Sequence, residues 1–423
     1  MNSYSIDVDR PSGPRWVNQS SHRAWLIDEA SRLLDFYQAA SINPEGGFFD
    51  LDDRGTPLPT GWPPASAPTR NLFQTTRIVH CFSLGHLLGR PGSSQLVDHG
   101  MRFLLNGHRD TEHGGYFWSN GYRSPLDTTK NAYGHAFVLL AASSAKAAGH
   151  PDADTLLADI SGILDTHFWD EEFGAIREDF HRDWTPVETY RGQNSNMHLT
   201  EALMAAFEVT GDTLYLTRAE RIATLLIKTA TANNNWRLPE HYDERWAIDY
   251  EYGRDVFRPY GSTIGHWLEW SRLLLQLWSL KGRSDDWMKA AAIKLFDKSV
   301  TEGWSPENGG FYFTVGWDGK PVDKDRYWWP CTEGIGAAAF LADITGEARF
   351  EGWYRRIWDW CEQHLIDRQN GSWHHQLNDD LKPTNDPWYG KPDLYHSLQA
   401  TLIPLLPTSG SVAHGLLHSG LKL

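Results

Sequence analysis

Apolar residues recur at helical spacing in two alternating kinds of segment along almost the whole chain. One kind is apolar on all sides and rich in Ala, Gly, Leu and Phe, which is typical of a buried helix. The other kind carries charged residues along one face, which is typical of a helix exposed on that side. The apolar segments span residues 76–88, 132–148, 196–210, 263–280, 332–344 and 394–406. The amphipathic segments, each preceding an apolar one, span residues 22–40, 94–106, 152–167, 214–232, 285–302 and 349–367.

A short motif of glycine followed by aromatic residues separates each amphipathic segment from the apolar one after it. The motif occurs around Gly47, Gly115, Gly174, Gly310 and Gly371. Its interval is about 60 residues, and the gap from Gly174 to Gly310 is about twice as long, as expected if one copy is degenerate. We expect that fourth copy within residues 239–253, where aromatic and turn-forming residues gather. The sequence therefore predicts six repeating units.

Twelve alternating outer and inner helices in six units predict an all-α fold, an (α/α)6 barrel with short β-hairpins at one end. Glycines at positions such as 149, 211, 282 and 346 lie just after the predicted inner helices, where glycine is typical of a C-terminal cap. Because the repeats cover residues 20–405 without a linker rich in Pro and Ser, we expect one domain over residues 1–423. The proline-rich stretch 57–68 lies within the first unit and is expected to shape the rim of a pocket.

Charge and cysteine content narrow the functional classes. The formal net charge of −15 repels phosphate backbones and argues against nucleic acid as a partner. Cys81, Cys331 and Cys361 are too few and too scattered for a disulfide framework or a zinc site. No apolar stretch is long enough for a membrane span, and residues 1–16 lack the apolar core of a signal peptide. We expect a cytoplasmic enzyme with no membrane partner, as a monomer or a homodimer.

Candidate chemistry lies at the beginnings of the inner helices, where an apolar core should carry no ionisable groups. If the barrel is correct, these beginnings converge on one mouth, and buried charges persist mainly where function requires them. Tryptophan, of which the chain has 21, is abundant in the hairpins, and an indole can stack on the apolar face of a sugar ring. The polar residues at the helix beginnings are Arg77, Tyr133, His135, Asn196, His198, Glu201, His266, Glu269, Glu333 and His396.

Two units share the spacing His-x-x-Glu, at His198 with Glu201 and at His266 with Glu269. On a helix this spacing places imidazole and carboxylate on one face, where they could orient a histidine, ligate a metal or form an ordinary salt bridge. The pattern lacks His-Glu-x-x-His and reverses the Glu-x-x-His order of dinuclear carboxylate sites, so we expect no metal. Nucleotide-binding loops and nucleophile elbows are also absent. Proton transfer by histidine, without a cofactor, is the remaining chemistry.

Strings with a recognisable sequence fall in order, one in each of the six units: Thr76-Arg77, Tyr133-Gly134-His135-Ala136-Phe137, Asn194-Ser195-Asn196-Met197-His198-Leu199-Thr200-Glu201-Ala202, Arg258-Pro259-Tyr260-Gly261 with Gly265-His266-Trp267-Leu268-Glu269-Trp270, Trp328-Trp329-Pro330 with Glu333, and Tyr395-His396. Together these strings resemble the N-acylglucosamine 2-epimerase superfamily of sugar epimerases and aldose–ketose isomerases. The resemblance spans residues 20–405 and is strongest toward the mannose isomerase and sulfoquinovose isomerase branch. It implies that His266 and His396 are the proton-transferring pair. It also implies that the sugar is contacted, or these histidines oriented, by Arg77, Asn196, His198 and Glu269. Trp329 and Glu333 would form the wall beside the sugar ring, and Tyr133, Arg258 and Trp388 would be further substrate-binding residues.

The expected reaction is the interconversion of D-mannose and D-fructose, with D-lyxose and D-xylulose as a further pair. His266 would open the sugar ring, and His396 would remove the C2 proton while Arg77 and His198 hold the enediolate oxygens. Returning that proton to C1 gives a ketose, whereas protonation of C2 from the opposite face gives the epimer. A sugar 2-epimerase of the mannose/glucose or cellobiose type is therefore the first alternative. Residues 388–396 depart from the tighter string of the cellobiose epimerase branch, which weakens a disaccharide assignment.

Three other classes stay open at this point. A sulfoquinovose isomerase would need a cationic group for the sulfonate, for which Arg258 and Arg123 are candidates. Glycoside hydrolases also occur on (α/α)6 barrels, and they use two catalytic carboxyl groups, which Glu201, Glu269, Glu333 or Asp179 could supply. A lectin would need aromatic and amide groups, but not two facing imidazoles.

Overall fold

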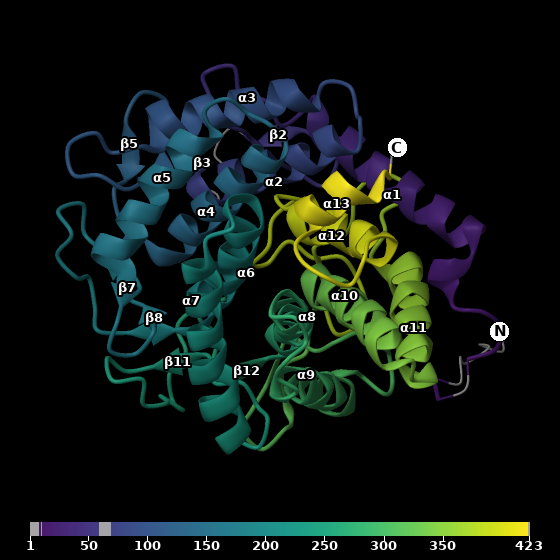
Figure 1. The fold of residues 1–423 in the computed structure, drawn as a ribbon. Coiled ribbons are helices and arrows are strands. Elements are labelled where there is room, and N and C mark those ends of the chain that lie inside the picture. The colour runs from purple at the N-terminus through teal and green to yellow at the C-terminus, as the bar shows by residue number, and fades with distance from the viewer. Residues whose placement is uncertain (1–7, 10, 59–68, 422–423) are drawn as a thin grey trace.

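The computed structural model describes residues 8–9, 11–58 and 69–421, so most of the proline-rich stretch at 57–68 lies outside the described residues. Within the described ranges, two concentric rings of helices form the barrel (Figure 1). The inner ring consists of α2 (Leu72–Leu87), α4 (Ala132–Ala147), α6 (Gln193–Thr210), α8 (Ile264–Leu280), α10 (Trp328–Thr345) and α12 (Tyr395–Leu402). The outer ring consists of α1 (Ser20–Gln38), α3 (Ser93–Phe103), α5 (Ala153–Ile163), α7 (Thr213–Ala223), α9 (Trp287–Lys298) and α11 (Ala348–His364). The predicted helix order is confirmed.

The two rings differ in burial as the hydrophobic pattern predicts. Inner helices such as α8 and α10 are buried on nearly every face, whereas outer helices such as α7 bury one stripe. Four outer helices continue toward the hairpins as π-helical turns, η2 (Leu104–His108), η3 (Leu164–Phe168), η4 (Thr224–Thr231) and η5 (Ser299–Gly303). Short 3-10 helices lie at η1 (Trp16–Asn18) and η6 (Ile403–Leu405). No helix in the described part of the chain is long and apolar enough to cross a membrane.

Tight turns follow the outer helices at the glycine motif. Gly310 has a φ of 71°, and its carbonyl accepts from the backbone N–H of Ser305 at 2.9 Å. A side chain at Gly310 would also collide with the indole of Trp360, so the turn requires glycine. The fourth turn uses Asn235 and Trp236, both with positive φ. Our prediction of this copy within residues 239–253 was therefore a few residues too late.

Two- and three-residue strands connect neighbouring units at the hairpin end. The strand before each of the five inner helices α2 to α10 pairs antiparallel with a strand of the following unit, in the pairs β3–β4, β6–β9, β10–β11, β12–β13 and β15–β16. At the sixth junction Lys391 N donates to Leu51 O at 2.8 Å, which ties the last unit to the first. Each inner helix therefore begins at a fixed place around one mouth. The strands are β1 (Asp50–Leu51), β2 (Pro57–Leu58), β3 (Arg70–Asn71), β4 (Ser119–Asn120), β5 (Pro125–Asp127), β6 (Lys130–Asn131), β7 (Trp169–Asp170), β8 (Ala175–Ile176), β9 (Asp179–Phe180), β10 (Arg191–Gly192), β11 (His241–Tyr242), β12 (Ser262–Thr263), β13 (Thr314–Val315), β14 (Pro321–Asp323), β15 (Arg326–Tyr327) and β16 (Gln376–Leu377).

A thirteenth helix, α13 (Val412–Ser419), contacts the inner helices α2, α4 and α6. Its first backbone N–H groups are capped by Ser411, and Glu208 Oε2 of α6 accepts from Ser411 N at 2.8 Å. The sequence pattern did not predict this helix. It covers the end of the barrel opposite the hairpins.

Candidate active site

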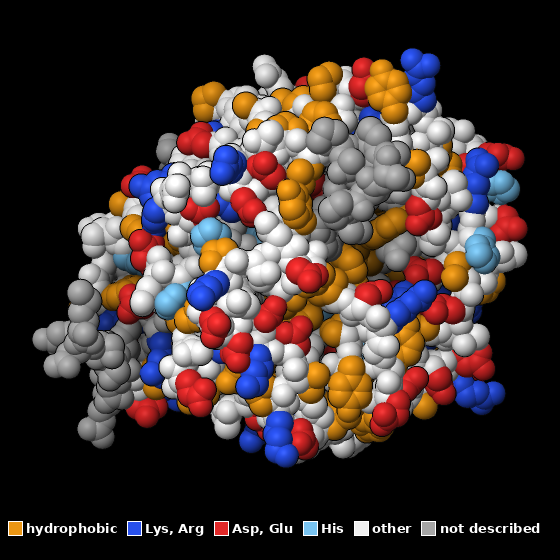
Figure 2. Space-filling model, turned by 180° about the vertical axis from the view of Figure 1, so that it is seen from behind, with side chains coloured by type: hydrophobic (Ala, Val, Ile, Leu, Met, Phe, Trp, Pro, Cys, Tyr) orange, Lys and Arg blue, Asp and Glu red, His pale blue; other side chains and the backbone are white. Residues whose placement is uncertain are grey.

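A cavity of about 450 Å³ opens at the hairpin end of the barrel. On the face seen in Figure 2, hydrophobic side chains gather around a central hollow flanked by charged ones. The cavity wall is formed by the beginnings of inner helices and by hairpin residues, as the repeat predicts. Nine of the predicted site residues line it: Arg77, Tyr133, His198, Arg258, His266, Glu269, Trp329, Trp388 and His396.

His266 lies in the first turn of α8 and is held by a carboxylate. Its Nδ1 is 2.9 Å from Glu240 Oε2, and Gln193 Nε2 donates to the same carboxylate oxygen at 2.8 Å. Gln193 Nε2 also lies 2.8 Å from His266 Nδ1. Because an ionised carboxylate can only accept, Nδ1–H of His266 donates to Glu240, and Nε2 is left for a ligand. Burial would raise the pKa of Glu240, but His266 and its hydrogen bond hold that pKa below its ordinary value.

His396 lies in the first turn of α12 and has an equivalent partner. Its Nδ1 is 2.9 Å from Glu333 Oε1, and its backbone N–H donates to Asp393 Oδ2 at 3.1 Å. Arg272 Nη2 is 3.0 Å from the other oxygen of Glu333. Burial would raise the pKa of Glu333, but Arg272 and His396 lower it below its ordinary value. Glu333 is therefore an ionised partner that fixes the ring of His396.

The two histidines flank α10, whose Trp329 contacts both rings. The indole centroid is 5.0 Å from the imidazole of His266 and 5.8 Å from that of His396. A Cβ at Gly265 would meet the ring of Trp329 at 2.1 Å, so only glycine lets this indole lie against α8. One aromatic surface thus separates two imidazoles that are each backed by a carboxylate.

Arg77 of α2 provides a positive charge on the cavity wall. Its Nη1 is 3.0 Å from Asp393 Oδ1, and its Nη2 donates to the hydroxyl of Tyr133 at 2.5 Å. Burial would lower the pKa of Arg77, but Tyr133 and Asp393 raise it. Burial also raises the pKa of Tyr133 to about 12, so this phenol is a hydrogen-bonding group at neutral pH.

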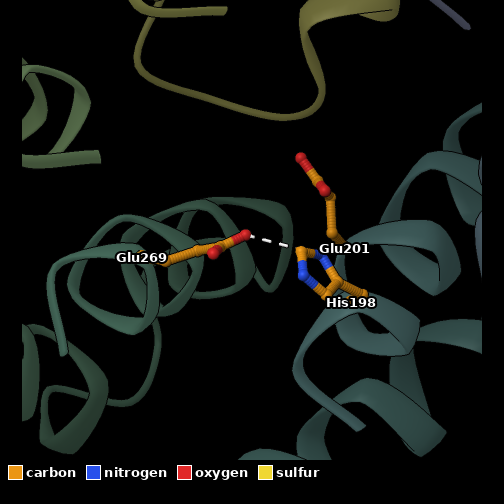
Figure 3. Close-up of side chains that lie close together, drawn as sticks. All are labelled: His198, Glu201 and Glu269. Atoms are coloured by element: carbon orange, nitrogen blue, oxygen red, sulfur yellow. Dashed lines mark ion pairs between the residues drawn. The ribbon is translucent and has the colours of Figure 1, made fainter. Parts of the chain in front are cut away.

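His198, Glu201 and Glu269 are the one group of described residues whose ligand atoms lie close enough to hold a metal, within 4.8 Å of one another. Figure 3 shows Glu269 of α8 pointing toward His198 of α6, with Nδ1 and Oε1 3.6 Å apart. Arg272 lies 3.6 Å from Glu201 and 3.7 Å from Glu269. The guanidinium already places a positive charge beside these two carboxyl groups, which disfavours a bound cation.

The pKa shifts of His198 and Glu269 also disfavour a bound cation. Burial, followed by the positive charge of Arg77, lowers the pKa of His198 well below its ordinary value. Burial, followed by the charge of Glu333, raises the pKa of Glu269 well above its ordinary value. Both shifts favour the uncharged forms of His198 and Glu269, which lie side by side at the cavity wall.

The structure does not bring two predicted residues, Asn196 and Glu333, to the cavity surface. Asn196 is fully buried, and its side chain accepts from Ile176 N at 2.8 Å and donates to Gly192 O at 2.9 Å. These hydrogen bonds hold strand β8 against α6, and they satisfy the buried backbone N–H of Ile176 and the buried C=O of Gly192. Glu333 was expected at the wall beside the sugar and instead lies behind His396.

Glu240, Gln193 and Asp393 are site residues that sequence reasoning missed. Asp393 stands three residues before His396 at the beginning of α12, a spacing typical of a side chain that caps a helix, so the sequence carried a signal for it. Glu240 carried no such signal, because it is 26 residues away from His266 and reaches it from the preceding hairpin.

Comparison with known proteins supplies an independent view of this arrangement. The profile of the N-acylglucosamine 2-epimerase family matches residues 46–400. A D-mannose isomerase of Thermobifida fusca is 44% identical over 412 residues, covering 96% of this chain and 99% of that protein. A D-mannose isomerase of Pseudomonas cannabina pv. alisalensis is 43% identical over 417 residues, covering 96% and 98%. The crystal structure of a D-mannose isomerase superposes with a TM-score of 0.84 at 31% sequence identity, covering 93% of this chain and 99% of that one.

Proposed function

The chain belongs to the N-acylglucosamine 2-epimerase family, and we propose that it is an aldose–ketose isomerase that interconverts D-mannose and D-fructose. The observation that carries this proposal is the pair of imidazoles, His266 and His396, facing one cavity with a carboxylate on each Nδ1. Isomerisation needs two positioned proton carriers and donors for the developing charge. Hydrolysis of a glycoside would instead need two carboxyl groups at the reacting centre.

The reaction begins with opening of the sugar ring. A general acid protonates the ring oxygen while a base accepts the proton of the anomeric hydroxyl, so that the C1–O5 bond breaks and an aldehyde forms. His266 serves as both base and acid in turn: with Nδ1–H fixed on Glu240, its Nε2 accepts the proton of the anomeric hydroxyl and delivers it to the ring oxygen. Trp329 beside it provides an apolar surface for the ring.

Proton transfer between C2 and C1 follows in the open chain. His396 removes the hydrogen on C2, and the electron pair moves into a cis-enediolate whose oxygens carry the negative charge. Arg77 and His198 line the same cavity and donate hydrogen bonds to that charge. Protonated His396 returns the proton to C1 while the hydroxyl proton on O2 moves to the negatively charged O1. The oxygen on C2 thereby becomes the carbonyl, and the product is the ketose. Glu333 stabilises the imidazolium between these steps.

The reaction is proposed to need no metal ion, because Arg272 occupies the electrostatic role that a cation would have beside Glu201 and Glu269. A sugar 2-epimerase is the second candidate. The position of His266 on the other side of α10 from His396 favours it, since delivery of a proton from a second imidazole would give the C2 epimer.

A panel of free aldoses followed by proton NMR separates the two candidates. D-mannose, D-lyxose, D-glucose and cellobiose are incubated with the protein and each product is identified. Conversion of mannose to fructose supports the isomerase. Exclusive formation of glucose from mannose would replace it with the epimerase, and inertness of all four sugars would overturn both.

A further inference from the structure

Arg258 is a cationic side chain on the cavity wall whose charge is already used. It lies in the loop before β12, lines the cavity and has a side chain 17% exposed. Its Nη2 is 2.8 Å from Asp179 Oδ2, and its Nη1 donates to Glu188 Oε1. Its guanidinium also stacks on the ring of Tyr190 at 4.2 Å. Two carboxylates therefore contact this guanidinium at the surface that a ligand meets, and the exposed Arg254 lies 4.0 Å from Glu188.

Carboxyl groups near Arg258 are fixed by hydrogen bonds from neighbouring side chains and backbone. Asp179 Oδ1 accepts from Asn131 Nδ2 at 2.7 Å across the β6–β9 pair. Glu178, which directly precedes Asp179, accepts from Gly192 N at 3.0 Å and from Ser195 Oγ at 2.7 Å. Burial and the charge of Asp179 raise the pKa of Glu178 to about 7. Carboxyl groups are thus crowded on this wall to the point where they disfavour further negative charge.

We propose that Arg258 is a masked anion-binding group, and that Asp179 and Glu188 restrict the cavity to sugars without an anionic substituent. This inference rests on the proposed function, because it names the substrate class of the same site as uncharged aldoses. A phosphate or sulfonate that approaches Arg258 meets two negative charges at hydrogen-bond distance from the guanidinium, so attraction and repulsion offset each other. Removing those charges leaves a planar, bidentate donor facing the cavity.

The alternative is that the three residues form a structural ion pair that only fastens the loop of Arg258 to the hairpin of Asp179. A structural pair and a masking pair both lose stability when the carboxylates are removed. Only a masking pair gains affinity for an anion. The gain in anion binding is therefore the quantity to measure.

The test uses the double variant Asp179→Asn with Glu188→Gln and inorganic sulfate as the probe, at constant ionic strength. Sulfate is small enough to reach the guanidinium however the sugar lies. We expect sulfate to inhibit mannose isomerisation with an inhibition constant at least tenfold lower than for the wild type, and to raise the melting temperature of the variant. Adding Arg258→Met to the double variant should abolish both effects.

Asp127→Asn is the matched control. Asp127 also lines the cavity, but its carboxylate accepts from the backbone N–H of Thr129 rather than pairing with Arg258. Equal sulfate sensitivity in this control and in the double variant would overturn the proposal, as would an insensitive double variant. If the double variant does not fold, Glu188→Gln alone should gain at least threefold in sensitivity. Wild-type protein that does not convert mannose refutes the proposed function, while the melting-temperature measurement still tests the anion site.

Discussion

Replacing Glu333 with glutamine keeps the shape of the side chain behind His396 and removes its charge. In the wild-type protein the carboxylate is 2.9 Å from His396 Nδ1 and 3.0 Å from Arg272 Nη2. When His396 takes the C2 proton, the imidazolium is stabilised by a charged hydrogen bond, a contribution of about 1.5–3 kcal/mol. Losing it should lower kcat roughly 10- to 150-fold. In this variant Glu201 and Glu269 remain close to Arg272, so its guanidinium does not become an unpaired buried charge.

The assay follows conversion of D-mannose by NMR, with kcat and KM determined separately and the melting temperature recorded for each variant. Glu29→Gln is the matched control, because Glu29 is also buried, pairs with Arg368 at 2.8 Å and accepts from Trp373 Nε1 at 3.0 Å, away from the cavity. This control should lose stability but keep its kcat. A Glu333→Gln enzyme with kcat within threefold of wild type would refute the role assigned to the carboxylate.

Further expectations concern the base, the metal and a distant carboxyl group. His396→Asn should abolish exchange of the C2 hydrogen in D2O while mannose still raises the melting temperature; full exchange would remove His396 from the mechanism. Activity should survive chelation with EDTA and dialysis, and a loss restored by an added divalent cation would contradict the metal-free reaction. Burial raises the pKa of Glu208 from 4.5 to about 7, so its ionised form destabilises the folded state as pH rises through that range. Glu208→Gln should therefore raise the melting temperature more at pH 8 than at pH 5, and an equal change at both pH values would contradict this.

The helical architecture could be predicted because each unit repeats the same pattern of burial. Helix α8 begins at Ile264 and ends at Leu280, against a predicted range of 263–280. Helix α13 follows the last repeat, so periodicity carried no information about it. The fourth turn was misplaced because Asn235 and Trp236 adopt the left-handed conformation that glycine adopts in the other units.

The cavity residues could be predicted in part, since a polar residue at the start of an inner helix has two possible uses. His266 and His396 face the cavity, whereas Asn196 satisfies backbone groups of a neighbouring hairpin. Sequence cannot separate these uses, because both depend on which way a side chain points. The partners of the histidines were harder still, since Glu240 reaches His266 from another hairpin.

The most direct measurement is the incubation of D-mannose with the protein in D2O, followed by NMR at the C1 and C2 positions. Without added metal, mannose should be converted to fructose, and deuterium should enter at C1 of the fructose or C2 of the mannose as the proton on His396 exchanges with solvent. Glucose as the only product, or mannose recovered with its C2 hydrogen intact and no fructose, would contradict the proposed isomerisation.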